Sequence, residues 1–173
     1  MITLRLATPA DAEPLAVLGA RTFVDTFVHG FGIPYPADDL AVYMKKAYSP
    51  DAIRPHLLDP ARHWLVAERG GDLVGFAEAG PCGLPHPDAS AAHGELKRLY
   101  LDRSVQGQGL GPEMLRRSLE WLEARDQGPL WIGVWSGNER AQRLYESRGF
   151  RKVGEYDYPV GAWLDREHIL RRG

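Results

Sequence analysis

The sequence has 173 residues, 44% of them hydrophobic and 25% charged, which is typical of one globular domain (residues 1–173) with a substantial core. The net charge is −2, and no basic run suggests nucleic acid as a partner. No apolar stretch is long enough to cross a bilayer, and the N-terminus lacks the apolar core of a signal peptide. The single cysteine, Cys82, allows no intrachain disulfide, which is compatible with a reducing cytoplasm. Together, these features lead us to expect a cytoplasmic protein without nucleic-acid or membrane partners.

The first third of the chain predicts a strand followed by helices. Residues 2–6 alternate between apolar and polar side chains, which indicates a strand. Thr8 is a candidate helix cap, and Pro9 would then occupy the first helical position. Residues 21–36 are rich in aromatic side chains and are interrupted by glycines and prolines. These residues, Gly30, Gly32, Pro34 and Pro36, break the segment before the next helical pattern.

A β-hairpin is predicted in the middle of the chain. Helical patterns in residues 40–47 and 51–58 lead up to it. Residues 63–69 and 72–79 are strand-like and are joined by two glycines, a strong hairpin signal. Residues 80–94 then form a long loop with three prolines and three glycines, and loops of this length are often functional.

A glycine-rich loop at residues 106–111 lies between a strand and a helix. Residues 95–101 form the strand, and Leu115, Leu119 and Leu122 mark one face of the helix, with Pro112 predicted at its first position. Main-chain N–H groups that converge at a helix N-terminus can bind an anion such as pyrophosphate. A tight turn packed against the helix is the alternative. No Gly-Lys-Ser/Thr follows, and the glycine spacing is not that of a dinucleotide fingerprint.

The last third of the chain predicts a strand, a short helix and an antiparallel pair. Residues 130–135 form the strand, residues 138–145 form the helix, and Gly149 ends it in a left-handed conformation. Residues 150–158 and 163–170 form the final pair. The whole order predicts an α/β (α+β) fold, with a mixed, mostly antiparallel sheet of about seven strands flanked by helices.

These motifs resemble those of the GNAT N-acetyltransferase family. The pattern Q-x-x-G-x-G at residues 106–111 resembles the acetyl-CoA loop of that family. The segment LWIGVW at 130–135, followed by Asn138 and Tyr145, is similar to its fifth strand and the helix after it. Arg148-Gly149-Phe150 is similar to the start of its sixth strand. The resemblance covers residues 95–158 and is greatest to the PaiA-type bacterial branch, which includes polyamine acetyltransferases.

The resemblance implies a GNAT fold, acetyl-CoA (coenzyme A) as the cofactor and transfer of its acetyl group to an amine. Leu99 would polarise the thioester carbonyl through its main-chain N–H group. The implied cofactor-binding residues are Leu99, Tyr100, Leu101, Gln106, Gly107, Gln108, Gly109, Leu110, Gly111, Asn138 and Tyr145.

Tyr145 is the candidate general acid, since a phenol with an ordinary pKa of about 10 can protonate the leaving thiolate at neutral pH. Its spacing from Ala141 and Leu144 also fits a packed core aromatic with a satisfied hydroxyl. Asn138 would contact the pantetheine arm or cap the helix. Ser136 competes for the cap, because Ser136 and Glu139 fit a capping box.

Glu95 is the candidate catalytic base, acting directly or through water. The alternative is a solvated glutamate at the end of a strand. Arg98 should lie on the opposite side of this strand by simple alternation, as a structural residue or at the mouth of the substrate site.

The acceptor is expected to be a small primary amine. Aromatic rings and carboxylates suit a polyamine, and the candidate substrate-binding residues are Phe23, Asp25, Phe27, Glu78 and Arg98. A protein N-terminus or lysine as acceptor, a non-catalytic acyl-CoA-binding regulator, and a homodimeric assembly stay open. No metal is expected, because Cys82, His86, Asp88 and His93 fit no familiar zinc spacing.

Overall fold

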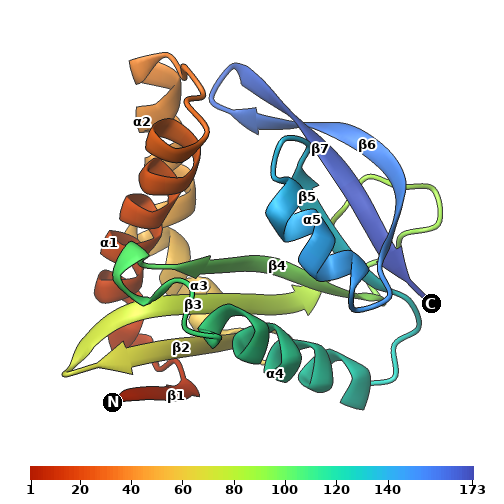
Figure 1. Cartoon of the computed structure of the whole chain (residues 1–173), viewed down its shortest axis with the longest axis horizontal. Helices are drawn as coiled ribbons and strands as arrows, with labels where there is room; N and C mark the ends of the chain where they lie inside the picture. Colours follow the sequence, from red (N-terminus) through yellow and green to blue (C-terminus); the bar gives the residue numbers. More distant parts are fainter.

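The computed structural model describes residues 1–173 as one seven-stranded sheet covered by five α-helices (Figure 1). The predicted fold class is confirmed. The sheet has the order β1-β2-β3-β4-β5-β7-β6. Its strands are β1 (Ile2–Leu6), β2 (His63–Arg69), β3 (Asp72–Pro81), β4 (Gly94–Leu101), β5 (Leu130–Trp135), β6 (Arg151–Val160) and β7 (Trp163–Arg172). The helices are α1 (Ala12–Phe23), α2 (Ala37–Tyr48), α3 (Pro50–Leu58), α4 (Leu110–Ala124) and α5 (Glu139–Glu146).

The central strands β4 and β5 are the only parallel neighbours in the sheet, and they pair only briefly. Gly94 to Leu96 pair with Leu130 to Ile132, and beyond that point the two strands share no register. All other neighbouring strands are antiparallel. In Figure 1, β1 to β4 run across the molecule, whereas β5 to β7 slant away from them. The sheet therefore opens between β4 and β5.

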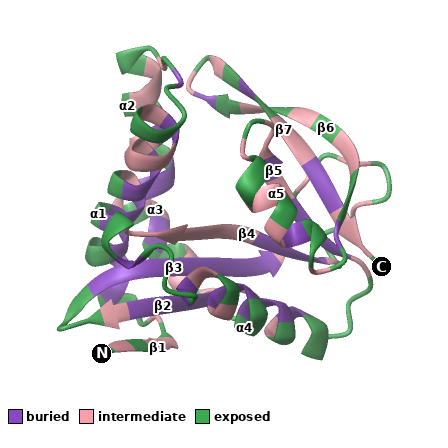
Figure 2. Ribbon diagram, viewed as in Figure 1, coloured by how far each residue is buried: buried purple, intermediate pink, exposed green.

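Two main cores cover the two faces of the sheet. One core packs α4 and α5 against the sheet through residues such as Met114, Leu115 and Tyr145. The other packs α1, α2 and α3 against it through residues such as Leu15 and Phe23. Figure 2 shows buried residues running along β2 and β3, between these layers. The opening between β4 and β5 thus lies between two packed layers.

The start of α4 differs from the sequence prediction. The helix begins at Leu110, so Pro112 is its third residue and not its first. Gly109 is the N-cap and has φ of +79°, a conformation that glycine adopts without strain. Proline is tolerated at the third position as well, because N–H groups of the first turn lack an intrahelical acceptor.

Thr8 is an N-cap and Pro9 a first helical residue as predicted, but they start a short 3₁₀ turn and not α1 itself. Pro9 begins a single 3₁₀ turn, Pro9–Asp11, and α1 begins only at Ala12. The main-chain N–H of Thr8 donates to the Asp11 carboxylate at 2.6 Å, and Arg5 also donates to Asp11 at 2.9 Å. This local network includes the Thr8 N-cap and fixes the entry to α1.

The aromatic segment after α1 is helical and does not break at once. Val24–Gly30 continues α1 as a π-helix, a rare form that is often found at functional sites. Its wider turn places the ring of Phe27 6.4 Å, and that of Phe31 4.7 Å, from the ring of Trp135 on β5. The segment therefore bridges the opening from the α1 side to the β5 side.

Gly19 on α1 provides a test of the packing behind the opening. A Cβ at Gly19 would lie 2.2 Å from Cδ1 of Tyr48, whose ring is 5% exposed and carries the Arg98 guanidinium at 4.9 Å. We expect Gly19→Ala to lower the free energy of unfolding by about 1–3 kcal/mol, as overpacking does. Glycine-to-alanine changes inside helices normally raise the free energy of unfolding by up to about 1 kcal/mol. Urea unfolding measures whether Gly19→Ala raises or lowers it.

The matched control is Val17→Ala, because Val17 is an exposed residue of the same helix. This variant should unfold at nearly the same urea concentration as the parent. A Gly19→Ala protein that is as stable as the parent would contradict the close packing of Tyr48 against α1.

Candidate active site

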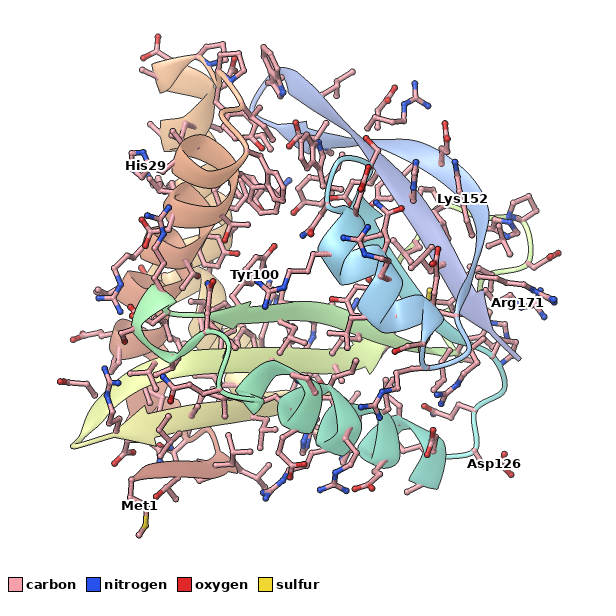
Figure 3. All side chains as sticks on the ribbon, viewed as in Figure 1. Met1, His29, Tyr100, Asp126, Lys152 and Arg171 are labelled. Atoms are coloured by element: carbon pink, nitrogen blue, oxygen red, sulfur yellow. The ribbon has the colours of Figure 1, made fainter.

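Two adjoining cavities occupy the opening between β4 and β5. The larger has a volume of about 820 Å³ and the smaller about 150 Å³. They share a border formed by β4 and α5, which contribute Leu99, Tyr100, Asn138, Ala141 and Tyr145 to both. Tyr100 is labelled near the centre of the molecule in Figure 3. A ligand in one cavity would therefore meet a ligand in the other beside Tyr145.

The glycine-rich loop forms one wall of the larger cavity. The main-chain N–H groups of Gly107, Gln108 and Gly109 donate to no acceptor in the chain. Those of Leu110 and Gly111 follow in the first turn of α4, where no intrahelical acceptor exists. A Cβ at Gly109 would meet nothing within 4 Å, so the space above the loop is open. The loop thus fits a pyrophosphate group, which accepts hydrogen bonds from such donors.

Most of the predicted cofactor-binding residues line this larger cavity, and two do not. Gln108 points away, and its Nε2 donates to the carbonyl of Ser104 at 3.1 Å. The Leu110 side chain is 9% exposed and packs in the core beneath α4. The predicted residues that line it are Leu99, Tyr100, Leu101, Gln106, Gly107, Gly109, Gly111, Asn138 and Tyr145.

Two arginines of the larger cavity were missed by the sequence analysis. Arg103 follows β4, and its Nη2 donates to the carbonyl of Asp25 at 2.8 Å. This bond ties the loop side of the cavity to the π-helix. Arg140 is exposed on α5, lines the same cavity and has no ion-pair partner in the chain. Single arginines carry no motif of their own, and only the fold brings these two together.

Asn138 begins α5. Its Oδ1 accepts the main-chain N–H of Ala141 at 3.1 Å, so Asn138 is the N-cap. The capping box predicted for Ser136 and Glu139 is therefore wrong, because Glu139 is already the first residue of the helix. The amide nitrogen of Asn138 makes no hydrogen bond and remains able to donate at the border of the two cavities.

Tyr145 combines a packed ring with an unpartnered hydroxyl. The residue is 8% exposed and belongs to the core beneath α5. Its hydroxyl forms no hydrogen bond within the chain, whereas the core-aromatic alternative required a satisfied one. Burial raises the pKa of Tyr145 to about 12, so the phenol stays protonated at any physiological pH. A neutral proton donor thus faces both cavities.

The smaller cavity is aromatic on the helix side. Phe23, Phe27, Tyr43 and Tyr48 form this wall, and Arg98 from β4 stacks on the Tyr48 ring. Three of the predicted substrate-binding residues, Phe23, Phe27 and Arg98, therefore line it. The volume of about 150 Å³ suits a group of only a few heavy atoms.

Glu95 also lines the smaller cavity, but its carboxylate has partners. Oε2 of Glu95 accepts Nζ of Lys97 at 3.0 Å and the main-chain N–H of Gly83 at 2.9 Å. The register of β3 and β4 skips Lys97, which makes it a β-bulge. Glu95 and Arg98 consequently share a face of β4, and the expectation that simple alternation would separate them is wrong.

Two predicted substrate-binding carboxylates lie outside the smaller cavity. Glu78 is 1% exposed and is paired with Arg62 and with Nε of Arg98 at 3.4 Å, so it is sealed beneath the pocket. Its prediction as a substrate contact is not supported by this position. Asp25 lines the larger cavity instead, because the π-helix carries it to the loop side.

The final hairpin supplies two carboxylates that the sequence analysis missed. In the register of β6 and β7, Tyr156 lies opposite Glu167 and Tyr158 opposite Asp165, and all four line the smaller cavity. Burial is the main cause that raises the pKa of Glu167 to about 7. The sequence shows acidic and aromatic residues alternating at 155–158 (EYDY) and acidic residues at both ends of 165–167 (DRE). Only the register of the two strands shows that these four side chains meet in one cavity.

The loop at residues 80–94 does not close the smaller cavity. Cys82 and Leu84 pack with Trp131 and Ile169 in a third, smaller core. His93 accepts the indole N–H of Trp131 at 3.1 Å.

No three His, Cys, Asp or Glu side chains form a group suited to a metal ion. None of the helices combines the length and apolar character that crossing a membrane requires.

A loop suited to a phosphate ester, a neutral phenol and an acidic pocket around one opening define a group-transfer enzyme on a mixed α/β sheet. Comparison with known proteins agrees. Residues 25–150 match the acetyltransferase (GNAT) family. An uncharacterised N-acetyltransferase of Mycobacterium bovis is 30% identical over 94% of this chain and 97% of its own length. The N-alpha-acetyltransferase RimI of Mycobacterium tuberculosis is 30% identical over 88% of this chain and 80% of its own.

A solved structure shows the same fold. The PaiA N-acetyltransferase of Thermoplasma acidophilum, in complex with coenzyme A, superposes with a TM-score of 0.75 at 18% identity, over 99% of this chain and 98% of that one. The chain belongs to the acetyltransferase (GNAT) family. It is an N-acetyltransferase that uses acetyl-CoA.

The role of the glycine loop can be tested by adding a side chain to it. Gly109 has φ of +79° with open space around its absent Cβ, so valine there would strain the loop and project beside the cofactor phosphates. We expect Gly109→Val to weaken acetyl-CoA binding roughly tenfold or more, a loss of about 1.4 kcal/mol or more. Isothermal titration calorimetry measures the affinity.

Gly71→Val is the matched control. Gly71 has φ of +93° and equally open surroundings, but it lies in the β2–β3 hairpin far from the cavity lining. Both variants should lose similar stability, and only Gly109→Val should lose affinity. Equal acetyl-CoA affinity in the two variants would exclude the loop as the phosphate site.

Proposed function

We propose that this enzyme transfers the acetyl group of acetyl-CoA to a small primary amine, by direct attack within a ternary complex. The observation that supports this most is the small pocket of about 150 Å³, lined by aromatic rings and by Asp165 and Glu167, next to Tyr145. Aromatic faces and unpaired carboxylates both favour a cation. The acceptor is therefore an amine that arrives as an ammonium ion.

The chain's own groups can perform the two tasks that the acyl donor requires. Acetyl-CoA supplies a thioester whose carbonyl carbon accepts the amine and whose sulfur leaves. The unpaired edge of β4 beyond Leu96 includes Leu99, whose main-chain N–H is proposed to polarise the carbonyl. Tyr145 donates its hydroxyl proton to the departing sulfur. The C–N bond forms as the C–S bond breaks.

Glu95 keeps its proposed place in the pocket, and its partners define its role more narrowly. Lys97 and the Gly83 N–H both donate to Oε2 of Glu95, so this oxygen already has two partners in the chain. Glu95 therefore orients the acceptor or a water molecule and is a weak candidate for direct proton removal.

A peptide N-terminus is the second candidate acceptor, because the RimI protein that is 30% identical to this chain is described as an N-alpha-acetyltransferase. A peptide needs a groove that continues beyond the reacting amine. Here Phe23, Phe27 and Tyr43 line one side of the pocket, and its volume of about 150 Å³ leaves room for only a few heavy atoms. These features favour a small amine over a peptide, and a short aliphatic diamine fits the acidic lining.

Ligand binding and turnover provide the direct test. Acetyl-CoA at about 100 times its dissociation constant should add roughly 2.7 kcal/mol to the free energy of unfolding, a rise of about 5–10 °C in Tm. NADH and ATP should leave Tm unchanged. Release of free CoA thiol is then measured with a panel of short alkylamines, diamines, polyamines and short peptides. A shift with ATP alone would remove the proposal, and binding without turnover would favour a regulator.

Tyr145→Phe separates proton donation from packing. The change removes one hydroxyl that has no partner in the chain and keeps the buried ring. We expect kcat to fall by roughly 10²-fold or more, with little change in KM for acetyl-CoA. Steady-state kinetics are compared at matched thermal stability. An acyl donor with a more acidic thiol should lose less, since its leaving group needs less protonation.

Leu144→Ala is the packing control, because Leu144 borders the same cavity on the same helix and has no acidic proton. Its effect should be equal for both acyl donors. An unchanged kcat for Tyr145→Phe, with chemistry rate-limiting, would assign Tyr145 to the core alone.

A further inference from the structure

Resting on the proposed function, we infer that the carboxylate of Glu167 accepts the proton that the acceptor ammonium loses before it attacks. Glu167 lies on β7, outside the segment whose motifs resemble the family. Its assignment comes from where the fold places it, from its missing cationic partner and from the space reserved for it on β5.

Gly133 leaves room for the Glu167 carboxylate at the opening of the sheet. A Cβ at Gly133 would lie 3.1 Å from Oε2 of Glu167 and 3.2 Å from the hydroxyl of Tyr156. The carboxylate therefore reaches across β5 just beyond Ile132, where β4 and β5 stop pairing. Any side chain at Gly133 would crowd this arrangement. The carboxylate thus lies in the pocket that Tyr145 also borders.

The Glu167 carboxylate is held by a hydrogen bond but has no cationic partner. Its Oε2 accepts the Tyr156 hydroxyl at 2.7 Å, and no lysine, arginine or histidine pairs with it. Glu95 is paired with Lys97, in contrast. Asp165, its neighbour along β7, accepts both the Trp163 indole N–H at 2.9 Å and the Tyr35 hydroxyl. Among the pocket carboxylates, Glu167 therefore accepts the fewest hydrogen bonds.

The environment of Glu167 suits a base at neutral pH. Burial raises its pKa to about 7, opposed by the Tyr156 hydrogen bond and supported by the negative charges of Asp165 and Glu95. Below that pH the carboxyl is protonated and cannot accept another proton, and above it the carboxylate is available. The titratable and charged side chains that line the same pocket are Tyr43, Tyr48, Glu95, Lys97, Arg98, Tyr100, Tyr145, Tyr156, Tyr158 and Asp165.

The proton balance closes with two residues. An N–H bond of the ammonium breaks and an O–H bond forms on Glu167, which leaves a neutral amine with a free electron pair. That pair forms the C–N bond as the sulfur leaves with the electrons of the C–S bond. Tyr145 gives its proton to the sulfur and takes the remaining one from the new amide nitrogen. Glu167 then returns its proton to water, so one proton is released per turnover.

The first variant is Glu167→Gln, in which the amide oxygen can still accept the Tyr156 hydroxyl. With an amine accepted by the parent, kcat/KM for the amine should fall by roughly 10²-fold or more at pH 8. The parent's rise in kcat/KM with a midpoint near pH 7 should disappear. The affinity for acetyl-CoA should stay the same. Glu155→Gln is the matched control, since Glu155 is an exposed carboxylate of the same hairpin that lies outside the pocket.

The second variant, Tyr156→Phe, moves the midpoint in a known direction. The Tyr156 hydrogen bond lowers the pKa of Glu167, so its loss should shift the midpoint of kcat/KM to higher pH. A merely structural role for the hairpin would lower the rate without moving the midpoint. The shift separates the two.

Thermal unfolding gives a readout that needs no activity. A carboxyl whose pKa is raised on folding destabilises the fold as pH rises through its folded pKa. The difference in Tm, variant minus parent, should therefore be larger for Glu167→Gln at pH 8 than at pH 5. A parent that acetylates no amine would overturn both the proposed function and this inference. An active parent whose Glu167→Gln variant keeps its rate and pH midpoint would overturn the inference alone.

Discussion

The short pairing of β4 with β5 is the constraint on which the rest of the site depends. After Leu96 and Ile132 the two strands separate inside the molecule, so main-chain groups of their facing edges lose their sheet partners. Buried main-chain groups rarely stay unsatisfied. A ligand that inserts between the strands can replace the missing partner, and both cavities meet there. The glycine loop, α5 and the final hairpin then approach one opening from three directions.

Buried charge beneath the opening explains why the pocket remains acidic. Arg98 lines the pocket, but its guanidinium is directed to Glu78, to the carbonyl of Ala47 and to the face of Tyr48. Removing one partner of such a buried pair typically costs about 3–5 kcal/mol, so the pairing is firmly held. The bulge at Lys97 brings Glu95 to the same face and gives it a cation of its own. The acids of β7, Asp165 and Glu167, have no cationic partner in the chain and give the pocket its negative charge.

The sequence predicted the parts of the site that depend on local pattern. The loop at 106–111, the strands around it and the helix with Asn138 and Tyr145 follow from glycine spacing, periodicity and resemblance. The acceptor side depends on register and on irregular backbone, which leave little local signal. The bulge at Lys97 changes which residues share a face with Glu95, and the π-helix at Val24–Gly30 carries Asp25 to the cofactor side. Glu167 becomes visible only once β6 and β7 are aligned.

One physical cause, the loss of water, underlies both the acid and the base that we propose at this opening. Burial disfavours the charged form of any acid, so it raises the pKa of Tyr145 to about 12 and that of Glu167 to about 7. Because the phenol starts from a pKa of about 10 and the carboxyl from about 4.3, the same effect keeps Tyr145 protonated and makes Glu167 a base near neutrality. The two groups lie on different elements, α5 and β7, and both line the smaller cavity. The proton transfers proposed above, from ammonium to carboxylate and from phenol to sulfur, therefore rest on residue type and placement.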